Sequence, residues 1–214
     1  FTVSKLFRFQ VVGLELVPAP PFLIASNHQA WYDALFIIAA LTRRGRLPMI
    51  FTMGRGDTVF NQGWKRWLLP RLGVFPILPD QGELDGPGLD TVYQILGRGG
   101  VVLIFPEGHY SRGSELLPLK RGVAHFALQA GVPISPLAIS GLERLRPWGK
   151  VRVVIGPAVW PSPPRWWSLT RRVAHLIERV RGGIQNAFDW RHPHSPSRLR
   201  RFWSGVCQAI SRGL

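Results

Sequence analysis

Two side chains whose types suit proton transfer, His28 and Asp33, lie five positions apart in the stretch NHQAWYD. A carboxylate bonded to one imidazole nitrogen fixes the tautomer and makes the other nitrogen a better general base. Inside one helix, five positions differ by about 140°, so the two side chains would not share a face. They can meet if His28 lies in a turn and Asp33 in the first turn of the following helix. The alternative is a capping aspartate beside a surface histidine.

A second polar stretch, LIFPEGHYSRG, begins with the end of another apolar run. Glu107 comes where a buried strand would end, so its carboxylate is either exposed or directed into a cleft. Gly108 would let the backbone approach a ligand closely, because glycine has no Cβ. Arg112 and Lys120 follow, and either could bind an anionic group.

The elements that must position these residues follow from the apolar pattern. Apolar runs predict strands at residues 11–17, 21–26, 48–52, 73–78, 101–105, 133–139 and 151–159. Helical patterns cover residues 31–43, 60–71, 88–98, 119–130 and 168–188. This alternation predicts an α/β fold, with a mixed, mostly parallel central sheet of about seven strands flanked by helices.

The 214 residues predict one catalytic domain over residues 1–160. A basic, tryptophan-containing helical extension over 161–214 is expected to pack on or beside it. Within that extension, residues 191–198 form a Pro/Ser linker before a last short basic helix. No apolar run reaches the roughly 18–20 residues that span a bilayer. Because the chain starts at Phe1, a membrane anchor upstream stays open.

The net charge of +15 is concentrated at one end of the chain, since residues 144–214 hold 14 Lys/Arg and two acids. Such a segment could bind nucleic acid or an anionic membrane, or it could be a solvated tail. The interleaved tryptophans favour the membrane, because tryptophan prefers the headgroup layer. We therefore expect an anionic membrane surface as a partner, and no nucleic acid.

The segment FNQGWKRWLLPRLG, residues 60–73, contains both basic residues and tryptophans. Phe60, Trp64 and Trp67 fall on one helical face, and the basic residues lie elsewhere. This pattern is typical of a short interfacial helix. The alternative, a helix that packs this face on the core of its own domain, is equally consistent with the spacing.

Metal and disulfide chemistry are not predicted. The single cysteine permits no internal disulfide and no cysteine metal cage. The G-x-S-x-G sequence of a serine nucleophile is missing, and we predict no metal site and no resident cofactor.

Taken together, these stretches resemble the glycerolipid acyltransferases of the lysophosphatidate acyltransferase type. NHQAWYD is similar to their N-H-x4-D motif, and FPEG with Ser111 is similar to F-P-E-G-T-R-S. Residues 117–139 resemble the pattern that follows, and LGVFPIL, residues 72–78, lies where the family has its second motif. The resemblance covers about residues 9–160.

The resemblance implies a glycerol-3-phosphate acyltransferase-like fold and a specific reaction. An acyl group would move from acyl-CoA or acyl-carrier protein to the hydroxyl of a lysophospholipid. The acceptor that the resemblance favours is 1-acyl-glycerol-3-phosphate, which would give phosphatidic acid. His28 would take the hydroxyl proton, and Asp33 would orient His28. Glu107, Gly108 and Ser111 would help to bind the acceptor.

This chain departs from the family pattern at two places that matter for phosphate binding. His109 and Tyr110 stand where the family has Thr-Arg, and Pro79-Asp80 stand where the second motif commonly carries an arginine. His109 could instead join the site. The headgroup would then be held by cationic side chains elsewhere, for which we nominate Arg55, Arg112 and Lys120.

Two alternatives stay open at this point. The same chemistry could act on another lysolipid or on an amino-acid lipid, because the expected arginines are missing. The chain could also be a non-catalytic basic membrane-binding protein, although such a module has no need of His28, Asp33 and Glu107. The expected location is the cytoplasmic side of a membrane, peripheral or anchored by a segment before Phe1.

Overall fold

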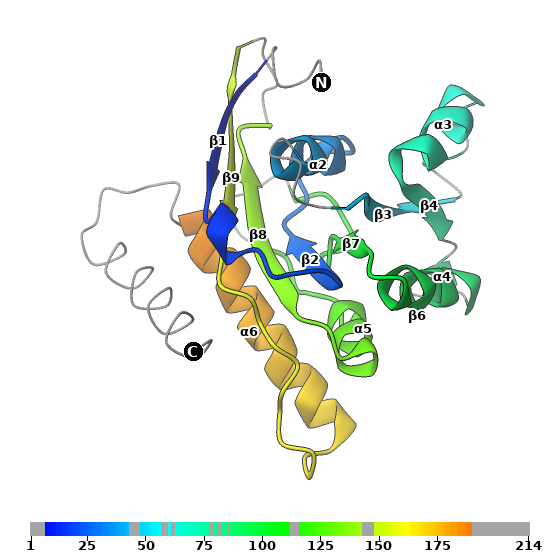
Figure 1. Ribbon diagram of the computed structural model, residues 1–214, viewed down its shortest axis with the longest axis vertical. Helices are drawn as coiled ribbons and strands as arrows, with labels where there is room; N and C mark the ends of the chain where they lie inside the picture. The colour runs from blue at the N-terminus through cyan, green and yellow to red at the C-terminus, as the bar shows by residue number, and fades with distance from the viewer. Residues whose placement is uncertain are drawn as a thin grey trace.

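A seven-stranded sheet forms the centre of the protein, with the strand order β1-β9-β8-β2-β7-β3-β4 (Figure 1). The strands are β1 (Arg8–Val12), β2 (Phe22–Ser26), β3 (Ile50–Arg55), β4 (Val74–Ile77), β7 (Val101–Ile104), β8 (Ile134–Ser140) and β9 (Lys150–Ile155). Neighbouring strands are parallel except β8 and β9, which pair antiparallel. A separate two-stranded antiparallel ribbon joins β5 (Pro79–Asp80) and β6 (Glu83–Leu84). The prediction of a mixed, mostly parallel sheet is confirmed.

This computed structural model describes residues 7–42, 48–56, 60, 63–77, 79–80, 83–84, 86–111, 116–142 and 148–189. Its helices are α2 (Asp33–Thr42), α3 (Gly63–Leu68), α4 (Gly86–Gly97), α5 (Gly122–Ala130) and α6 (Leu169–Asp189), with 3-10 turns η1 (Leu14–Leu16) and η2 (Pro70–Leu72). The predicted linker over 191–198 and the helix after it lie outside the described residues.

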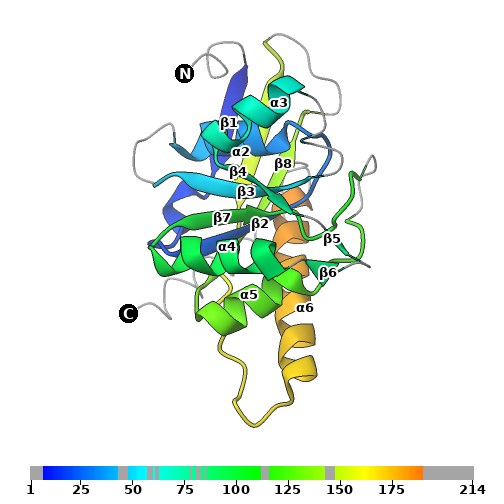
Figure 2. The same cartoon turned by 90° about the vertical axis from the view of Figure 1, so that its right-hand side faces the viewer.

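Helices cover both faces of the sheet (Figure 2). Along β2, Phe22 and Ile24 pack in one core cluster with α2, whereas Leu23 and Ala25 pack in another with α4, α5 and α6. Successive strand residues point to opposite faces, so a strand covered on both sides is apolar throughout. Full burial of each large side chain stabilises the fold by roughly 1.5–3 kcal/mol.

Helix α6 lies on the sheet along a stripe of buried side chains. Val173, Leu176, Val180 and Ile184 recur every three or four residues, which places them on one helical face. Near its end the helix passes close to Pro136 of β8, since a Cβ on Gly183 would lie 2.7 Å from the Pro136 Cγ. Within the described residues no helix is both long and apolar enough to cross a bilayer.

Three predicted elements end earlier than the apolar pattern suggests. The strand predicted at 11–17 stops at Val12, because Gly13 takes a left-handed conformation (φ 80°) before η1. The strand predicted at 151–159 stops at Ile155, and Val159 rejoins the sheet through an isolated bridge to Ile134. The helix predicted at 60–71 is divided into α3 and η2, because Pro70 has no backbone N–H to continue a helix.

Candidate active site

The two polar stretches meet at one edge of the sheet. Strands β2 and β7 are parallel neighbours, with Ala25 opposite Ile104, so the residues after each strand leave the sheet side by side. His28 follows β2 and Glu107 follows β7. The backbone N–H of His28 donates to Glu107 Oε1 at 2.8 Å, although the two residues are 79 positions apart. The carboxyl end of a parallel sheet is where α/β proteins commonly bind their ligands.

His28 and Asp33 form a hydrogen-bonded pair. His28 lies in the turn after β2, Asp33 is the first residue of α2, and His28 Nδ1 lies 3.0 Å from Asp33 Oδ2. The same Oδ2 accepts hydrogen bonds from the backbone N–H groups of Gln29 and Ala30. The aspartate therefore caps the turn and contacts the imidazole, whereas the expected alternative of a surface histidine is not met, because the His28 side chain is only 16 % exposed. The role of the pair in proton transfer stays a prediction.

This arrangement determines which nitrogen of His28 is available for chemistry. The Asp33 side chain is fully buried, and its carboxylate oxygen can only accept a hydrogen bond, so His28 Nδ1 carries the proton in this pair. The lone pair of His28 is then on Nε2, which is the nitrogen that can take a proton from a substrate. Asp33 Oδ1 has no hydrogen-bond partner among the described residues.

Two aromatic rings hold the imidazole from its sides. The Phe105 ring stacks on the His28 ring with centroids 3.8 Å apart and an interplanar angle of 14°. The Tyr110 ring lies 4.5 Å away at 57°. The histidine side chain is only 16 % exposed, so it keeps one orientation with limited access to water. Partial burial, and then the charge of Asp33, raise the pKa of Tyr110, so its hydroxyl stays protonated at neutral pH.

Glu107 is bound by backbone rather than directed into open space. Its side chain is 3 % exposed, with Oε1 on the His28 N–H and Oε2 accepting from the Leu117 N–H at 2.9 Å. Burial raises the pKa of the Glu107 carboxyl, and the hydrogen bonds from Leu117 and His28 oppose that shift in part. The carboxylate thus joins the turn after β2 to the chain beyond β7.

Further backbone bonds hold the same loop in place. The Ser111 N–H donates to the His28 carbonyl oxygen at 2.7 Å, and the Lys120 N–H donates to the Pro106 carbonyl oxygen at 2.7 Å. The Ser111 bond and the Glu107 Oε1 bond together satisfy the carbonyl and the N–H of His28, and the Lys120 bond holds the loop itself. The predicted roles of Ser111 and Glu107 in acceptor binding stay predictions.

The cations nominated from the sequence divide into three cases. Lys120 approaches the site, since a Cβ added to Gly108 would lie 2.8 Å from its Nζ, and Gly108 itself has a φ of 71°. Arg55 is the exposed last residue of β3, at the same edge of the sheet. Arg112 lies outside the described residues. Lys120 is therefore the nominated cation that the structure brings against the loop beside Glu107.

Asn27 is a positioning residue that the sequence reasoning missed. Its amide nitrogen donates to the Ile139 carbonyl oxygen at 3.0 Å, and its Oδ1 accepts from the Ile139 N–H at 2.8 Å. The side chain is 3 % exposed and so extends the pairing of β2 with β8 by one step. An asparagine at the end of the strand, after Ser26 and directly before the histidine, was the available signal.

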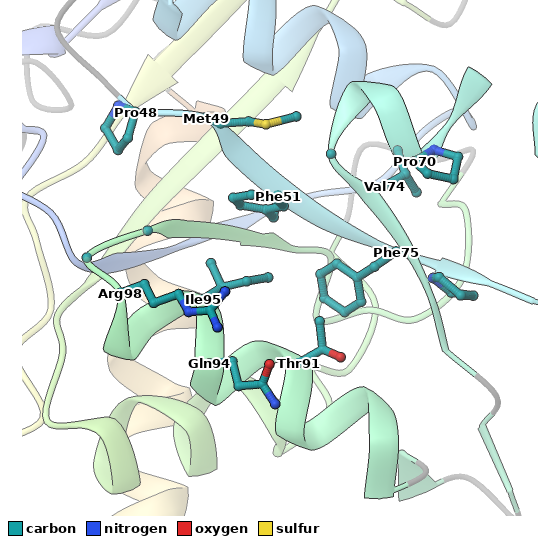
Figure 3. Close-up of a pocket in the computed structure, with 14 residues that line it drawn as sticks. Pro48, Met49, Phe51, Pro70, Val74, Phe75, Thr91, Gln94, Ile95 and Arg98 are labelled. Atoms are coloured by element: carbon teal, nitrogen blue, oxygen red, sulfur yellow. The ribbon is translucent and has the colours of Figure 1, made fainter. Parts of the chain in front are cut away.

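A separate cavity of about 510 Å³ lies between α4 and the strands β3 and β4 (Figure 3). Met49, Phe51, Phe75 and Ile95 give it apolar walls, and Arg98 stands at its edge. Met49, directly before β3, and Gly100, directly before β7, line the cavity, so it lies at the amino ends of these strands and away from the carboxyl ends near His28 and Glu107. Among the described residues, no cluster of three His, Cys, Asp or Glu side chains could hold a metal ion.

A sequence model of the acyltransferase family matches residues 8–140, which is more than half of the chain and includes both polar stretches. The chain belongs to the acyltransferase family. The resemblance seen in the two motifs is thereby confirmed.

Named relatives of this acyltransferase agree with the family model. The chain is 31 % identical over 183 residues to the 1-acyl-sn-glycerol-3-phosphate acyltransferase of Bacillus subtilis (strain 168), covering 80 % of this chain and 87 % of that protein. It is 26 % identical over 171 residues to a chloroplastic 1-acyl-sn-glycerol-3-phosphate acyltransferase of Brassica napus, covering 75 % of this chain. It spans only about half of that relative, 48 % of its length.

A solved structure is similar in fold. The crystal structure of the 1-acyl-sn-glycerophosphate acyltransferase from Thermotoga maritima matches with a TM-score of 0.61 and 22 % identity, over 84 % of this chain and 71 % of that one. The predicted acyltransferase-type fold is confirmed by this likeness.

Proposed function

We propose that this acyltransferase moves a fatty acyl group from a thioester to the hydroxyl of a lysophospholipid, with 1-acyl-glycerol-3-phosphate as the acceptor. The thioester would be acyl-CoA or acyl-carrier protein, used as a co-substrate. The observation that carries the proposal is the 3.0 Å contact between His28 Nδ1 and Asp33 Oδ2, which leaves Nε2 as the base. The names of the Bacillus and Brassica relatives support this choice of acceptor.

The chemistry follows from the arrangement around His28. Nε2 takes the proton of the acceptor hydroxyl while the hydroxyl oxygen attacks the thioester carbonyl carbon. The C–S bond then breaks, and the imidazolium returns the proton to the departing thiolate, which leaves as a free thiol. Asp33 stabilises the imidazolium that forms in between. The products are a new ester and a thiol, and no acyl-enzyme is needed.

The second wall of the site has a positioning part and a binding part. Glu107 holds the His28 backbone through its Oε1 and so fixes the base relative to the loop after β7. We assign anion binding to the exposed face of that loop, where Gly108 lets Lys120 lie close to the backbone. Arg55, at the same edge of the sheet, is the second candidate for the headgroup.

We also propose that the enzyme works at an anionic membrane on its cytoplasmic side. The acceptor is a lipid, the chain carries a net charge of +15, and large aromatic side chains are exposed. A segment before Phe1 would add to this attachment or replace it.

The test supplies acyl-CoA or acyl-carrier protein with 1-acyl-glycerol-3-phosphate and measures thiol release with DTNB. Mass spectrometry of the lipid then identifies the product. We expect stoichiometric thiol and phosphatidic acid. An enzyme that is folded and bound to vesicles, and yet releases no thiol with any acceptor and either donor, would refute the proposal.

A second acceptor class is favoured by one observation. Tyr110 occupies the position of the missing arginine, and the centre of its ring lies 4.5 Å from that of the His28 ring. At this position a neutral tyrosine ring suits an acceptor without phosphate better than a charged arginine side chain would. A panel of lysolipids with and without phosphate decides between them, because activity confined to phosphate-free acceptors excludes lysophosphatidate.

A further inference from the structure

A compact aromatic and basic surface lies next to the candidate site. It consists of Trp31, Trp64, Trp67, Lys65, Arg66 and Arg71, and we call it the α3 surface. The three tryptophans are 49 %, 57 % and 63 % exposed, and helix α3 contains no buried residue. The interpretation of this helix as one that packs on its own core is therefore wrong.

The α3 surface is held together by contacts between cations and rings. Lys65 Nζ lies 5.0 Å from the centre of the Trp31 ring and 5.6 Å from that of Trp64. The Arg71 guanidinium lies 4.1 Å from the Trp67 ring. Such contacts orient the indoles while leaving them exposed. Trp31 is three residues after His28, so the Lys65–Trp31 contact fixes α3 beside the turn that carries the base.

We propose that the α3 surface is where this enzyme docks on an anionic lipid bilayer, and that docking brings the turn of His28 to the headgroup layer. The second part of this inference, that the site must face lipid, rests on the proposed function. The first part, that the protein docks through α3, rests only on the residues of the α3 surface.

Charge and residue type select the lipid surface as the occupant. Residues 60–77 carry Lys65, Arg66 and Arg71 and no acid, so the surface is complementary to anionic headgroups. Tryptophan rings with apolar bodies and one N–H prefer the boundary between headgroups and acyl chains. A bilayer accepts both features at once, whereas water leaves the apolar rings exposed.

The test measures partition of the full chain into vesicles of phosphatidylcholine with phosphatidylglycerol, by sedimentation and without substrate. We expect the double variant Trp64→Ala/Trp67→Ala to lose about tenfold or more in vesicle affinity, because two large rings no longer leave water. Vesicles of phosphatidylcholine alone, or higher salt, should weaken binding of the unchanged protein.

A matched control removes two other strongly exposed tryptophans far from α3. Trp160 and Trp166 are 56 % and 79 % exposed and lie in the segment between β9 and α6, at the other end of the molecule from α3 (Figures 1 and 2). Arg171 packs 4.1 Å from the ring of neighbouring Trp167, which ties this segment to α6. We expect Trp160→Ala/Trp166→Ala to lose less than about threefold in vesicle affinity.

Several results would overturn the docking proposal. One is an equal loss in the two double variants, and another is no loss on removal of Trp64 and Trp67. A third is a changed oligomeric state by light scattering with unchanged vesicle affinity, which would assign the surface to a second copy. Binding to vesicles does not depend on acyl transfer. A protein that docks through α3 but transfers no acyl group would therefore refute the proposed function and leave the docking proposal intact.

Discussion

The two walls of the candidate site are built in different ways. On the first wall, Asp33 bonds His28, Gln29 and Ala30, all within five positions of itself. On the second wall, Glu107 bonds the N–H of His28, 79 positions away, and that of Leu117, ten positions away. The first wall is a local turn that carries the proposed base, and the second is a set of hydrogen bonds that exists only after the sheet has formed.

This difference separates two kinds of carboxylate in one site. Asp33 acts on the imidazole, so its replacement should change the chemistry directly. Glu107 acts on backbone, so its replacement should change position and stability first.

Removal of the base should have the largest effect. We expect His28→Ala to lower kcat/KM by roughly 10²–10⁴-fold, because general base catalysis is lost at the reacting hydroxyl. Thiol release with saturating acyl-CoA measures the change, and the unfolding midpoint serves as the control for intact fold. An unaltered rate in a folded variant would remove His28 from the mechanism.

Replacement of the orienting carboxylate should come next. We expect Asp33→Asn to lower kcat by roughly 10- to 10³-fold with a smaller change in KM, because an amide holds the imidazole in the wrong tautomer. Steady-state kinetics separate the two constants. If KM rises while kcat stays constant, Asp33 contributes to binding instead.

Glu107→Gln should act mainly on stability. The amide can accept from only one of the two N–H groups, and its own NH₂ faces the other, so we expect a loss of about 1–3 kcal/mol in the free energy of unfolding. Denaturant unfolding measures it. A drop in kcat that matches His28→Ala, with stability unchanged, would place Glu107 in the chemistry and break the comparison.

The pH dependence of that stability has a definite sign. Burial raises the pKa of Glu107 above its ordinary value of 4.5, so the folded protein holds this proton more tightly than the unfolded chain does. Its contribution is therefore fully present below pH 4.5 and is lost as the pH rises through the folded-state pKa. The advantage of the native protein over Glu107→Gln should shrink over that range, and an advantage that grows with pH would reverse our account of this carboxyl.

The same contrast explains what the sequence could predict. His28 and Asp33 were found because a short turn brings them together, and Phe22–Ser26 was found because a strand covered on both faces is apolar throughout. The partners of Glu107 and Asn27 depend on how distant strands are placed side by side. No spacing along the chain encodes that placement, and the motif resemblance marked Glu107 without showing what it bonds.

Element ends and surfaces show the same limit. Strand β1 ends before Gly13, which has a left-handed conformation. The Gly13 backbone lies so close to Ile155 that a Cβ on Gly13 would be 2.3 Å from the Ile155 carbonyl oxygen. The face of α3 was ambiguous because an amphipathic pattern does not say whether core or lipid covers it. The exposed fractions of Trp64 and Trp67 show that the core does not cover this face.

A double-mutant cycle on kcat/KM tests whether His28 and Asp33 act as one catalytic unit. The four proteins are the native enzyme, His28→Ala, Asp33→Asn and the double variant. If Asp33 acts through His28, the rate of the double variant should be within about threefold of that of His28→Ala. If Asp33→Asn lowers kcat/KM by the same factor in the His28→Ala background as in the native enzyme, the two residues act independently and not as one unit.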